Sequence, residues 1–294
     1  MSRHCPAFRM TRYVLPLLVW LVTLCPPHAA HAEGCAELGA GQQLPTLDNA
    51  KLSPRTQLLC NARYAVLYSG LAHEPLWSAE HLDTAMIRAA MSTPRRGDFH
   101  PDPRIAPGER AELEDYVRSG FDRGHMSPSG DMPDEQTQEE TFLLSNIVPQ
   151  RAALNRGRWE EIESAVRRLT LREGELYVVT GPAFHGATLS AIGTDRVLVP
   201  TSTWKAIYDP RREQTGVYVC HNVARAPGCS HVSVAELTHV TGIDPFPALP
   251  ARLKQTCMAL PLGTTGTTRA RTHTRTHRAP RYHRRRSRHI YYRW

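Results

Sequence analysis

The chain has 294 residues, which is enough for one large domain or two small ones. Its formal charge is +8, but residues 263–294 hold ten arginines and no acid, and residues 1–32 hold three more arginines. Residues 33–262 therefore carry 23 Lys and Arg against all 28 Asp and Glu, a net charge of −5. Overall basicity is thus excluded as evidence that the folded part binds nucleic acid, because it arises at the ends of the chain.

The first 32 residues have the pattern of a secretory signal peptide. Three arginines precede the apolar run 13–25, and the sequence AHA at 30–32 provides a cleavage site before Glu33. A run of 13 residues is shorter than the roughly 20 apolar residues that a membrane-spanning helix requires. We therefore predict cleavage before Glu33 and a protein that is secreted or periplasmic, with no stable membrane anchor after cleavage.

Five of the seven cysteines follow the predicted cleavage site, so disulfides can form in an oxidising compartment. Cys220 and Cys229 flank a short turn and are candidates to close a loop, while a bond between Cys35 and Cys60 would pin the N-terminal arm. The sequence does not fix this connectivity. Cys257 is the candidate for an unpaired thiol.

The predicted body of the fold begins after a polar, turn-rich stretch at residues 33–60. Residues 65–69 (AVLYS) form a short apolar strand, and 74–82 form a second extended stretch. Residues 92–110 combine prolines, glycines and charges, which is the composition of a loop.

The strongest helix signal starts at Asn155 and ends at Gly174. Between them, apolar residues recur at spacings of three and four, as on the buried face of a helix. These residues are Trp159, Ile162, Val166 and Leu169.

Short β-branched or aromatic runs bounded by Gly or Pro follow this helix and predict further strands. They lie at residues 176–180, 197–199, 205–208 and 217–219. Strands and helices without strict alternation favour an α+β fold around a largely antiparallel sheet.

The last segment, from Gly263, is composed mostly of Thr, Arg and His. It cannot bury enough apolar surface to offset its ordering entropy, so we predict a disordered Arg/His-rich tail. The predicted organisation is a signal peptide at 1–32, one domain at 33–262 and the tail at 263–294.

The block at residues 119–132 (SGFDRGHMSPSGDM) contains a group of residues suited to phosphoryl chemistry. Neutral His125 can accept a proton near pH 7, and Arg123 can hold phosphate oxygens. Gly124 permits a close backbone approach. Four residues alone do not distinguish this from a structural histidine near a turn.

A second block, SNIVPQRAALNRGRWEEIE at residues 145–163, leads into the predicted helix. Magnesium prefers oxygen ligands and keeps most of its waters, so the amide of Asn155 can be its single protein ligand. Glu163 lies eight residues further on, about 12 Å along a helix, which is too far to share the metal. It can instead reach a water bound to the metal, or it is a solvated helix residue.

DRGH, followed by SNIVPQ and LNRGRW in this order and spacing, resembles the sugar-non-specific DNA/RNA endonuclease family. The ββα-metal core of that family belongs to the His-Me finger nucleases. The likeness continues through GELYVVTGPAF (174–184), VLVPTSTWKAIYD (197–209) and VAELTHVTGIDPFPAL (234–249), and spans roughly residues 60–250. His239 departs from the pattern, in a segment where an acid is common.

The resemblance implies roles for four residues of this chain. His125 matches the general base that activates water, and Asn155 matches the magnesium ligand. Arg123 matches the arginine that stabilises the phosphate, and Glu163 matches the acid that orients metal-bound water.

Other positions are assigned less sharply by the resemblance. Asp122, Asn146 and Gln150 match positions that support the histidine and the metal loop, or they are purely structural. The family's further substrate-contacting arginine lies upstream, where we name Arg95 and Arg96 as candidates without choosing between them; Arg104 lies in the same loop.

The implied reaction is hydrolysis of phosphodiester bonds in DNA and RNA with Mg²⁺, or Mn²⁺ in its place. Since none of these residues reads a base edge, little sequence preference is expected. A sequence-specific nuclease is disfavoured because no DNA-reading helix module is apparent. The sequence leaves open whether the protein is a homodimer.

The alternative reading is a catalytically inert secreted protein that binds nucleic acid or another polyanion through the arginine-rich tail. Within an active nuclease, we expect the same tail to raise the local substrate concentration by electrostatic attachment.

Overall fold

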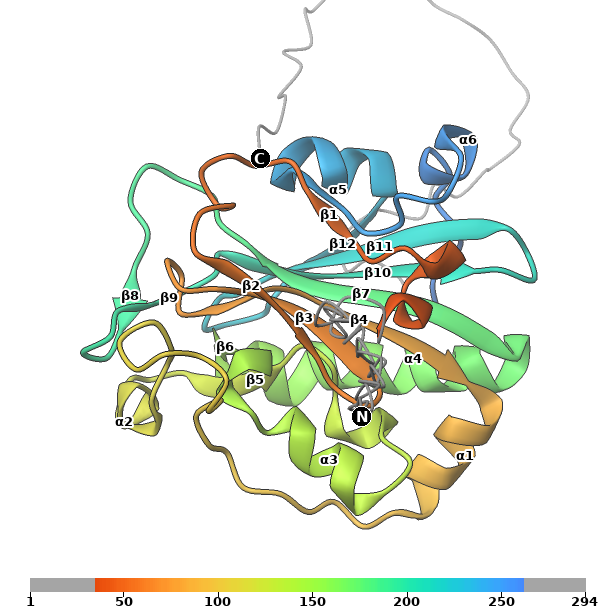
Figure 1. Ribbon diagram of the computed structural model, residues 1–294. Helices are drawn as coiled ribbons and strands as arrows, with labels where there is room; N and C mark the ends of the chain where they lie inside the picture. Colours follow the sequence, from red (N-terminus) through yellow and green to blue (C-terminus); the bar gives the residue numbers. More distant parts are fainter. Residues whose placement is uncertain (1–34, 262–294) are drawn as a thin grey trace, which may run out of the picture. The chain divides into compact units, whose positions relative to one another are not determined.

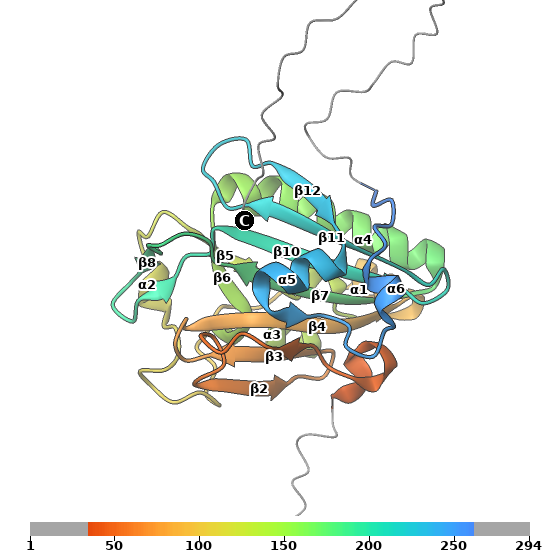
Figure 2. The same ribbon diagram turned by 90° about the horizontal axis from the view of Figure 1, so that it is seen from above.

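The computed structural model describes residues 35–261, so the predicted signal peptide and the arginine-rich tail lie outside the described residues. Its central element is a seven-stranded antiparallel sheet with strand order β12-β11-β10-β7-β4-β3-β2 (Figures 1 and 2). The strands are β2 (Thr56–Cys60), β3 (Tyr64–Ser69), β4 (Glu74–Asp83), β7 (Glu175–Ala183), β10 (Ser202–Asp209), β11 (Gln214–His221) and β12 (Cys229–Val232).

Three two-stranded antiparallel ribbons accompany this sheet. They pair β1 (Thr46–Leu47) with β13 (Ile243–Asp244), β5 (Asp122–His125) with β6 (Ile147–Gln150), and β8 (Ala191–Ile192) with β9 (Val197–Leu198).

The α-helices are divided between the two faces of the sheet (Figure 1). On one side lie α1 (Thr84–Ser92), α3 (Glu135–Thr141) and α4 (Glu160–Glu173), and on the other lie α5 (Val234–Thr241) and α6 (Ala251–Lys254). The short α2 (Leu113–Tyr116) lies near the β8–β9 ribbon.

Short helical turns connect these elements. They are the 3₁₀ turns η1 (Ala36–Leu38), η2 (Ala40–Gln42), η3 (Ser129–Asp131) and η4 (Leu144–Asn146), and the π-helical turn η5 (Leu154–Trp159).

Successive strand residues alternate between two cores, one on each face of the sheet. Val178 and Ile207 pack in the core with α4, whereas their neighbours Val179 and Ala206 pack in the core with α5. Burying both faces requires apolar residues on both sides of each central strand, which explains runs such as LYVVT.

Helix α4, together with the last residue of η5, docks on the sheet through the predicted apolar stripe. Trp159, Ile162, Val166 and Leu169 each expose 2% or less of their surface. Burial of each such side chain contributes roughly 1.5–3 kcal/mol. The helix ends at Gly174, whose φ of 102° is accessible to glycine at little steric cost.

The α+β fold with a largely antiparallel sheet is confirmed, and so are the strands expected at 65–69, 74–82, 176–180, 205–208 and 217–219. The structure settles the cysteine pairing that the sequence left open: the disulfides are the two candidate pairs, Cys35–Cys60 and Cys220–Cys229, and Cys257 is unpaired. Within residues 35–261, no helix has the length and apolar character needed to cross a membrane.

Three predictions about local structure require correction. Residues 33–60 were expected to lack regular structure before the body of the fold, but 56–60 form the edge strand β2. The regular α-helix starts at Glu160 rather than Asn155, because Gly157 departs from helical geometry within η5. The strand expected at 197–199 is the two-residue β9, which pairs only with β8 outside the main sheet.

Candidate active site

The two sequence blocks meet in a ββα unit made of β5, β6 and the helical segment η5–α4. In the β5–β6 ribbon, Asp122 lies opposite Gln150 and His125 lies opposite Ile147. Gly124 is required at this point because a Cβ there would lie 2.8 Å from the Cβ of Gln150 and would overlap its amide. The glycine therefore leaves room for the Gln150 side chain across the ribbon, at the residue before the histidine.

His125 ends β5 and exposes only 8% of its surface. Its ring centroid lies 5.3 Å from that of Phe99 and 5.0 Å from that of Phe142. Burial, and then the positive charge of Arg95, lower the pKa of His125 to about 3, so the imidazole is neutral at pH 7. Its Nε2 atom has no hydrogen-bond partner among the described residues. This nitrogen is itself buried, so the small part of the residue that stays exposed lies away from Nε2.

The loop after His125 is braced by the fully buried side chain of Asn146. Its Oδ1 accepts the Ser127 N–H at 3.0 Å, and its Nδ2 donates to the carbonyls of Ser127 at 2.9 Å and Thr141 at 3.0 Å. This accounts for every polar atom of the amide group. Asn146 holds the loop of the histidine rather than facing the pocket.

Asn155 lies in η5, and a carboxylate fixes the orientation of its amide. Its Nδ2 donates to Asp122 Oδ2 at 3.1 Å. Asp122 also accepts hydrogen bonds from Arg156, at 2.7 Å from Nε and 2.6 Å from Nη2. With the amide nitrogen engaged, the oxygen of Asn155 is the atom left for a ligand.

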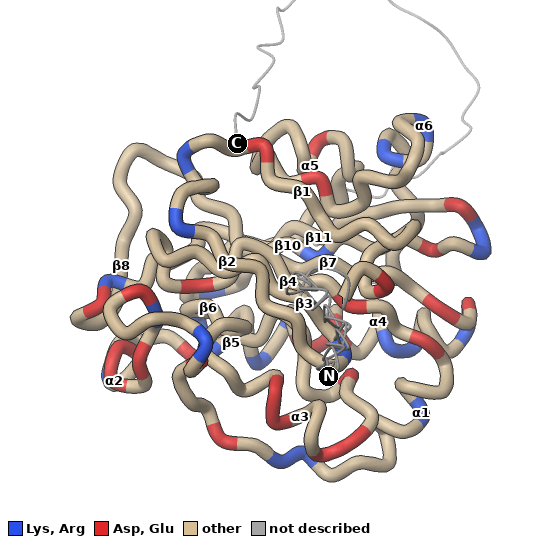
Figure 3. The backbone as a smooth tube through the Cα atoms, viewed as in Figure 1, with Lys and Arg blue, Asp and Glu red and all other residues tan. Residues whose placement is uncertain are grey.

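Asn155 and His125 line the same pocket, which has a volume of about 350 Å³. Four arginines and two glutamates also line it, so this pocket is cationic although residues 33–262 are acidic overall. These residues are Arg95, Arg123, Arg156, Arg167, Glu160 and Glu163. Figure 3 shows that positive and negative residues are otherwise distributed along the whole described chain.

Two of these guanidinium groups rest on aromatic rings next to His125. Arg123 lies 4.4 Å from the ring centroid of Phe99, and Arg95 lies 5.5 Å from that of Phe142. Such cation–π contacts hold the charges at the pocket without neutralising them.

Arg96 and Arg104, which lie in the same loop as Arg95, do not line this pocket. Arg96 is 68% exposed and pairs with Glu135 at 3.3 Å. Arg104 is engaged by the buried Asp102 at 2.6 Å. Of the two candidates for the upstream arginine, the structure brings Arg95 to the histidine and directs Arg96 to α3.

Glu163 is half-buried on the pocket side of α4 rather than fully solvated. Burial raises the pKa of Glu163 to about 7; the charge of Asp131 adds to this effect, while Lys205 and Arg167 oppose it. A carboxyl group with a pKa near neutrality can exchange a proton in the working pH range.

Sequence reasoning missed two cations beside Glu163. Arg167, one helical turn further along α4, donates to Asp131 at 2.8 Å. Its spacing of four from Glu163 is a signal for a shared helix face. Lys205 is buried in β10, where its Nζ donates to Thr180 Oγ1 at 2.6 Å and to the Met126 carbonyl at 3.4 Å. No local pattern in the sequence links Lys205 to this site.

The donor set at the pocket fits magnesium better than a transition metal. Among residues 35–261, no group of three or more His, Cys, Asp or Glu side chains is arranged to hold a metal ion. The hard amide oxygen of Asn155 suits an ion that keeps several waters and takes further oxygen ligands from a phosphate.

Comparison with known proteins gives a consistent result. The model of the DNA/RNA non-specific endonuclease family matches residues 46–252. The chain is 36% identical over 208 residues to the mitochondrial nuclease EXOG of Danio rerio, covering 63% of this chain and 60% of the relative. It is 34% identical to the Homo sapiens protein of the same name, and this match covers 66% of this chain and 58% of the relative. The chain therefore spans about 60% of the length of these two relatives.

A bacterial relative matches over more of its length. A nuclease of Nostoc sp. is 30% identical over 252 residues, covering 77% of this chain and 89% of the relative. Among solved structures, a chain from the EndoG/EndoGI complex superposes with a TM-score of 0.63 at 28% identity, covering 68% of this chain and 89% of that chain.

Proposed function

Because the chain belongs to the DNA/RNA non-specific endonuclease family, we propose that it is a metal-dependent endonuclease that hydrolyses phosphodiester bonds of DNA and RNA. The observation that carries this proposal is the shared pocket of His125 and Asn155. There, a neutral imidazole and a free amide oxygen lie among four arginines.

His125 is the general base in this proposal. Its lowered pKa keeps it unprotonated at neutral pH, so a ring nitrogen is able to take a proton from the attacking water. The surrounding phenylalanine rings exclude competing water from the imidazole. When substrate binds, the negative phosphate raises the proton affinity of the ring, which favours the transfer.

The arginines stabilise the negative charge that grows on the phosphate in the transition state. Arg123 and Arg95 serve this role because their aromatic contacts leave their charge unpaired. Arg156 differs, since it is already paired with Asp122. We assign Arg156 and Asp122 to orienting Asn155.

Asn155 is the protein ligand for Mg²⁺, with Mn²⁺ as a substitute. When bound, the metal supplies Lewis-acid stabilisation of the phosphate oxygens and the leaving group. Glu163 lines the same pocket as Asn155, and its half-buried carboxyl group orients water there. Asn146 and Gln150 support this arrangement without contacting the substrate.

Low sequence preference follows from the kind of contacts available. Arginine and metal contacts to phosphate position a nucleic acid but carry no base information. The reaction also requires no 2′-hydroxyl, so DNA and RNA are both substrates in this proposal.

We further infer export from the cell, with the signal peptide removed before Glu33. Two disulfides in the described residues are typical of an oxidising compartment. The EXOG relatives are named mitochondrial, so the N-terminal sequence of the purified protein is the direct test.

The nuclease proposal is tested with residues 33–294 on plasmid DNA and on structured RNA, with Mg²⁺, with Mn²⁺ and with EDTA. We expect both substrates to be cleaved only with metal, and a His125→Ala variant to lose this activity. Metal-dependent cleavage that His125→Ala leaves intact would refute the assigned base. Tight, salt-sensitive binding without any cleavage would favour the inert polyanion binder.

A further inference from the structure

Asn222, immediately after β11, links three segments through a single side chain. Its Nδ2 donates to the carbonyls of Pro149 and Pro200, both at 2.9 Å, and its Oδ1 accepts the Arg151 N–H at 2.7 Å. The residue is 92% buried, with 8% of its surface exposed. An apolar or shorter side chain would leave the two buried carbonyls and the part-buried Arg151 N–H without this partner.

Two of these three contacts fall on the chain just before η5. Arg151 is the residue that leads from β6 into the turn, and its carbonyl accepts the Asn155 N–H at 2.9 Å. Asn222 Oδ1, the Arg151 peptide groups and the Asn155 backbone are therefore linked in series. A shift of Arg151 would move Asn155 with it.

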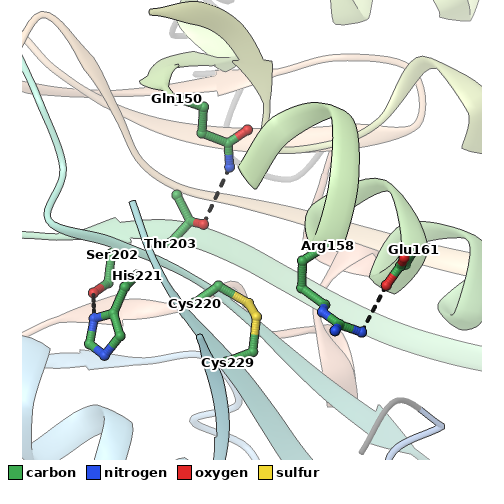
Figure 4. Close-up of a disulfide and its surroundings, with 8 residues drawn as sticks. All are labelled: Gln150, Arg158, Glu161, Ser202, Thr203, Cys220, His221 and Cys229. Atoms are coloured by element: carbon green, nitrogen blue, oxygen red, sulfur yellow. Dashed lines mark hydrogen bonds and ion pairs between the residues drawn. A yellow bond between two sulfur atoms is a disulfide. The ribbon is translucent and has the colours of Figure 1, made fainter. Parts of the chain in front are cut away.

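Asn222 is itself firmly held. Its backbone N–H donates to the Thr201 carbonyl at 2.9 Å. Two residues earlier, Cys220 pairs with Cys229 across the β11–β12 register and forms a disulfide (Figure 4). On the other side of β11, Cys220 lies opposite Thr203, which accepts a hydrogen bond from Gln150 at 3.3 Å. The end of β6 is thus tied to the main sheet at two adjacent residues.

The opposite side of Arg151 is also fixed. Its guanidinium lies 3.9 Å from the ring centroid of Phe121, and its Nη1 donates to the Gly120 carbonyl at 3.4 Å. Phe121 directly precedes Asp122, which holds the amide of Asn155. Arg151 therefore connects the sheet contact made by Asn222 to the strand that orients Asn155.

We propose that Asn222 is a positioning residue that sets the place of Asn155, and so tunes how tightly the protein binds its divalent cation. This inference rests on the proposed role of Asn155 as the metal ligand. Asn222 acts through backbone hydrogen bonds and does not line the pocket that contains His125 and Asn155. Its substitution should therefore change metal affinity more than the binding of nucleic acid.

The test is Mn²⁺ binding to the full chain without substrate, followed by electron paramagnetic resonance, for wild type and Asn222→Ala. Partners that orient a metal ligand typically contribute roughly 10- to 100-fold in affinity, so we expect Asn222→Ala to weaken Mn²⁺ binding at least about 10-fold. The part of the Mn²⁺ signal that is lost in Asn155→Ala is the part that belongs to this site. Asn49→Ala is the matched control, because Asn49 also donates to a distant backbone carbonyl, that of Thr241, on the α5 side of the sheet. It should bind Mn²⁺ like the wild type.

A second readout separates positioning from general destabilisation. In cleavage assays well below the unfolding temperature, Asn222→Ala should raise the metal concentration for half-maximal rate while leaving KM for DNA within about twofold. The double variant Asn155→Ala/Asn222→Ala should be no slower than Asn155→Ala alone. If Asn222→Ala fails to fold, the milder Asn222→Ser is used, since its shorter side chain cannot span the same three groups.

The possible results distinguish the two proposals. Equal Mn²⁺ affinity in wild type and the Asn222 variant would overturn the positioning role and leave the nuclease proposal intact. If the wild type does not bind Mn²⁺, or if Asn155→Ala binds Mn²⁺ as tightly as the wild type, the metal role of Asn155 is refuted. The positioning role of Asn222 is then refuted as well.

Discussion

The Asn146 side chain provides the sharpest structural prediction, because three buried groups depend on it. Asn146→Ala would leave the Ser127 N–H and the carbonyls of Ser127 and Thr141 without partners. Each unsatisfied buried group costs about 1–3 kcal/mol, so even the low end sums to about 3 kcal/mol. For a folded part of this size, that corresponds to a decrease in Tm of roughly 6–12 °C.

Differential scanning calorimetry of wild type and Asn146→Ala measures this loss directly. Asn146→Asp is the informative second variant, because it keeps the acceptor for Ser127 N–H but turns an oxygen toward two carbonyls. We expect it to be at least as destabilised as Asn146→Ala. A decrease in Tm below about 2 °C for both variants would refute the view that Asn146 braces the His125 loop.

Three further predictions concern charge, covalent links and the tail. Hydrogen bonds from Arg104 and Ser145 outweigh burial and hold the pKa of Asp102 below its ordinary value. A depressed folded-state pKa contributes stability that is present above the unfolded pKa of about 3.9 and is lost as the pH falls through the folded value. Urea unfolding should therefore show a stability gap between wild type and Asp102→Asn at pH 7 that narrows below about pH 4; a constant gap would contradict this. The Cys35–Cys60 and Cys220–Cys229 bonds close loops with sequence separations of 25 and 9, so replacing either pair by serine should lower the free energy of unfolding by roughly 3 kcal/mol. Equal urea midpoints with and without reductant would show that the bonds are dispensable. Truncation after Leu262 should weaken DNA binding and reduce the slope of log affinity against log salt by up to about 9 if all ten tail arginines contact phosphates, while turnover at saturating DNA persists. An unchanged slope would refute electrostatic attachment by the tail.

Local patterns were sufficient where a residue's environment depends on its own element. The apolar spacing of Trp159 through Leu169 predicted the buried face of α4, because a helix places those positions on one side. The DRGH block likewise indicated His125, since its neighbours in sequence are also its neighbours in the site.

Prediction was weaker where contacts join distant segments. Strand β2 was missed because it is an edge strand with a half-exposed pattern, and Leu58 exposes 40% of its surface. Lys205 in β10 and Asn222 after β11 contact the backbone next to the site residues, at Met126 and Arg151, and no spacing in the sequence indicates those contacts. The choice between Arg95 and Arg96 depended on the path of a proline-rich loop, and secondary-structure propensities do not determine that path.

Some predictions concern parts or states of the protein beyond the described residues. The predicted signal peptide and the predicted disorder of the tail lie outside residues 35–261, and a homodimer stays a prediction. Sedimentation analysis of residues 33–294 at several concentrations would establish the oligomeric state.

The central claim is that His125 is the general base of a metal-dependent nuclease. Its most direct test is the single-turnover cleavage rate of a DNA duplex at saturating enzyme and Mg²⁺. His239→Ala serves as the matched control, since His239 is exposed on α5 beyond the opposite face of the sheet. We predict that His125→Ala lowers the rate about 10²- to 10⁴-fold while DNA affinity and the His239→Ala rate stay near wild type. A His125→Ala rate within a few fold of wild type would contradict the account.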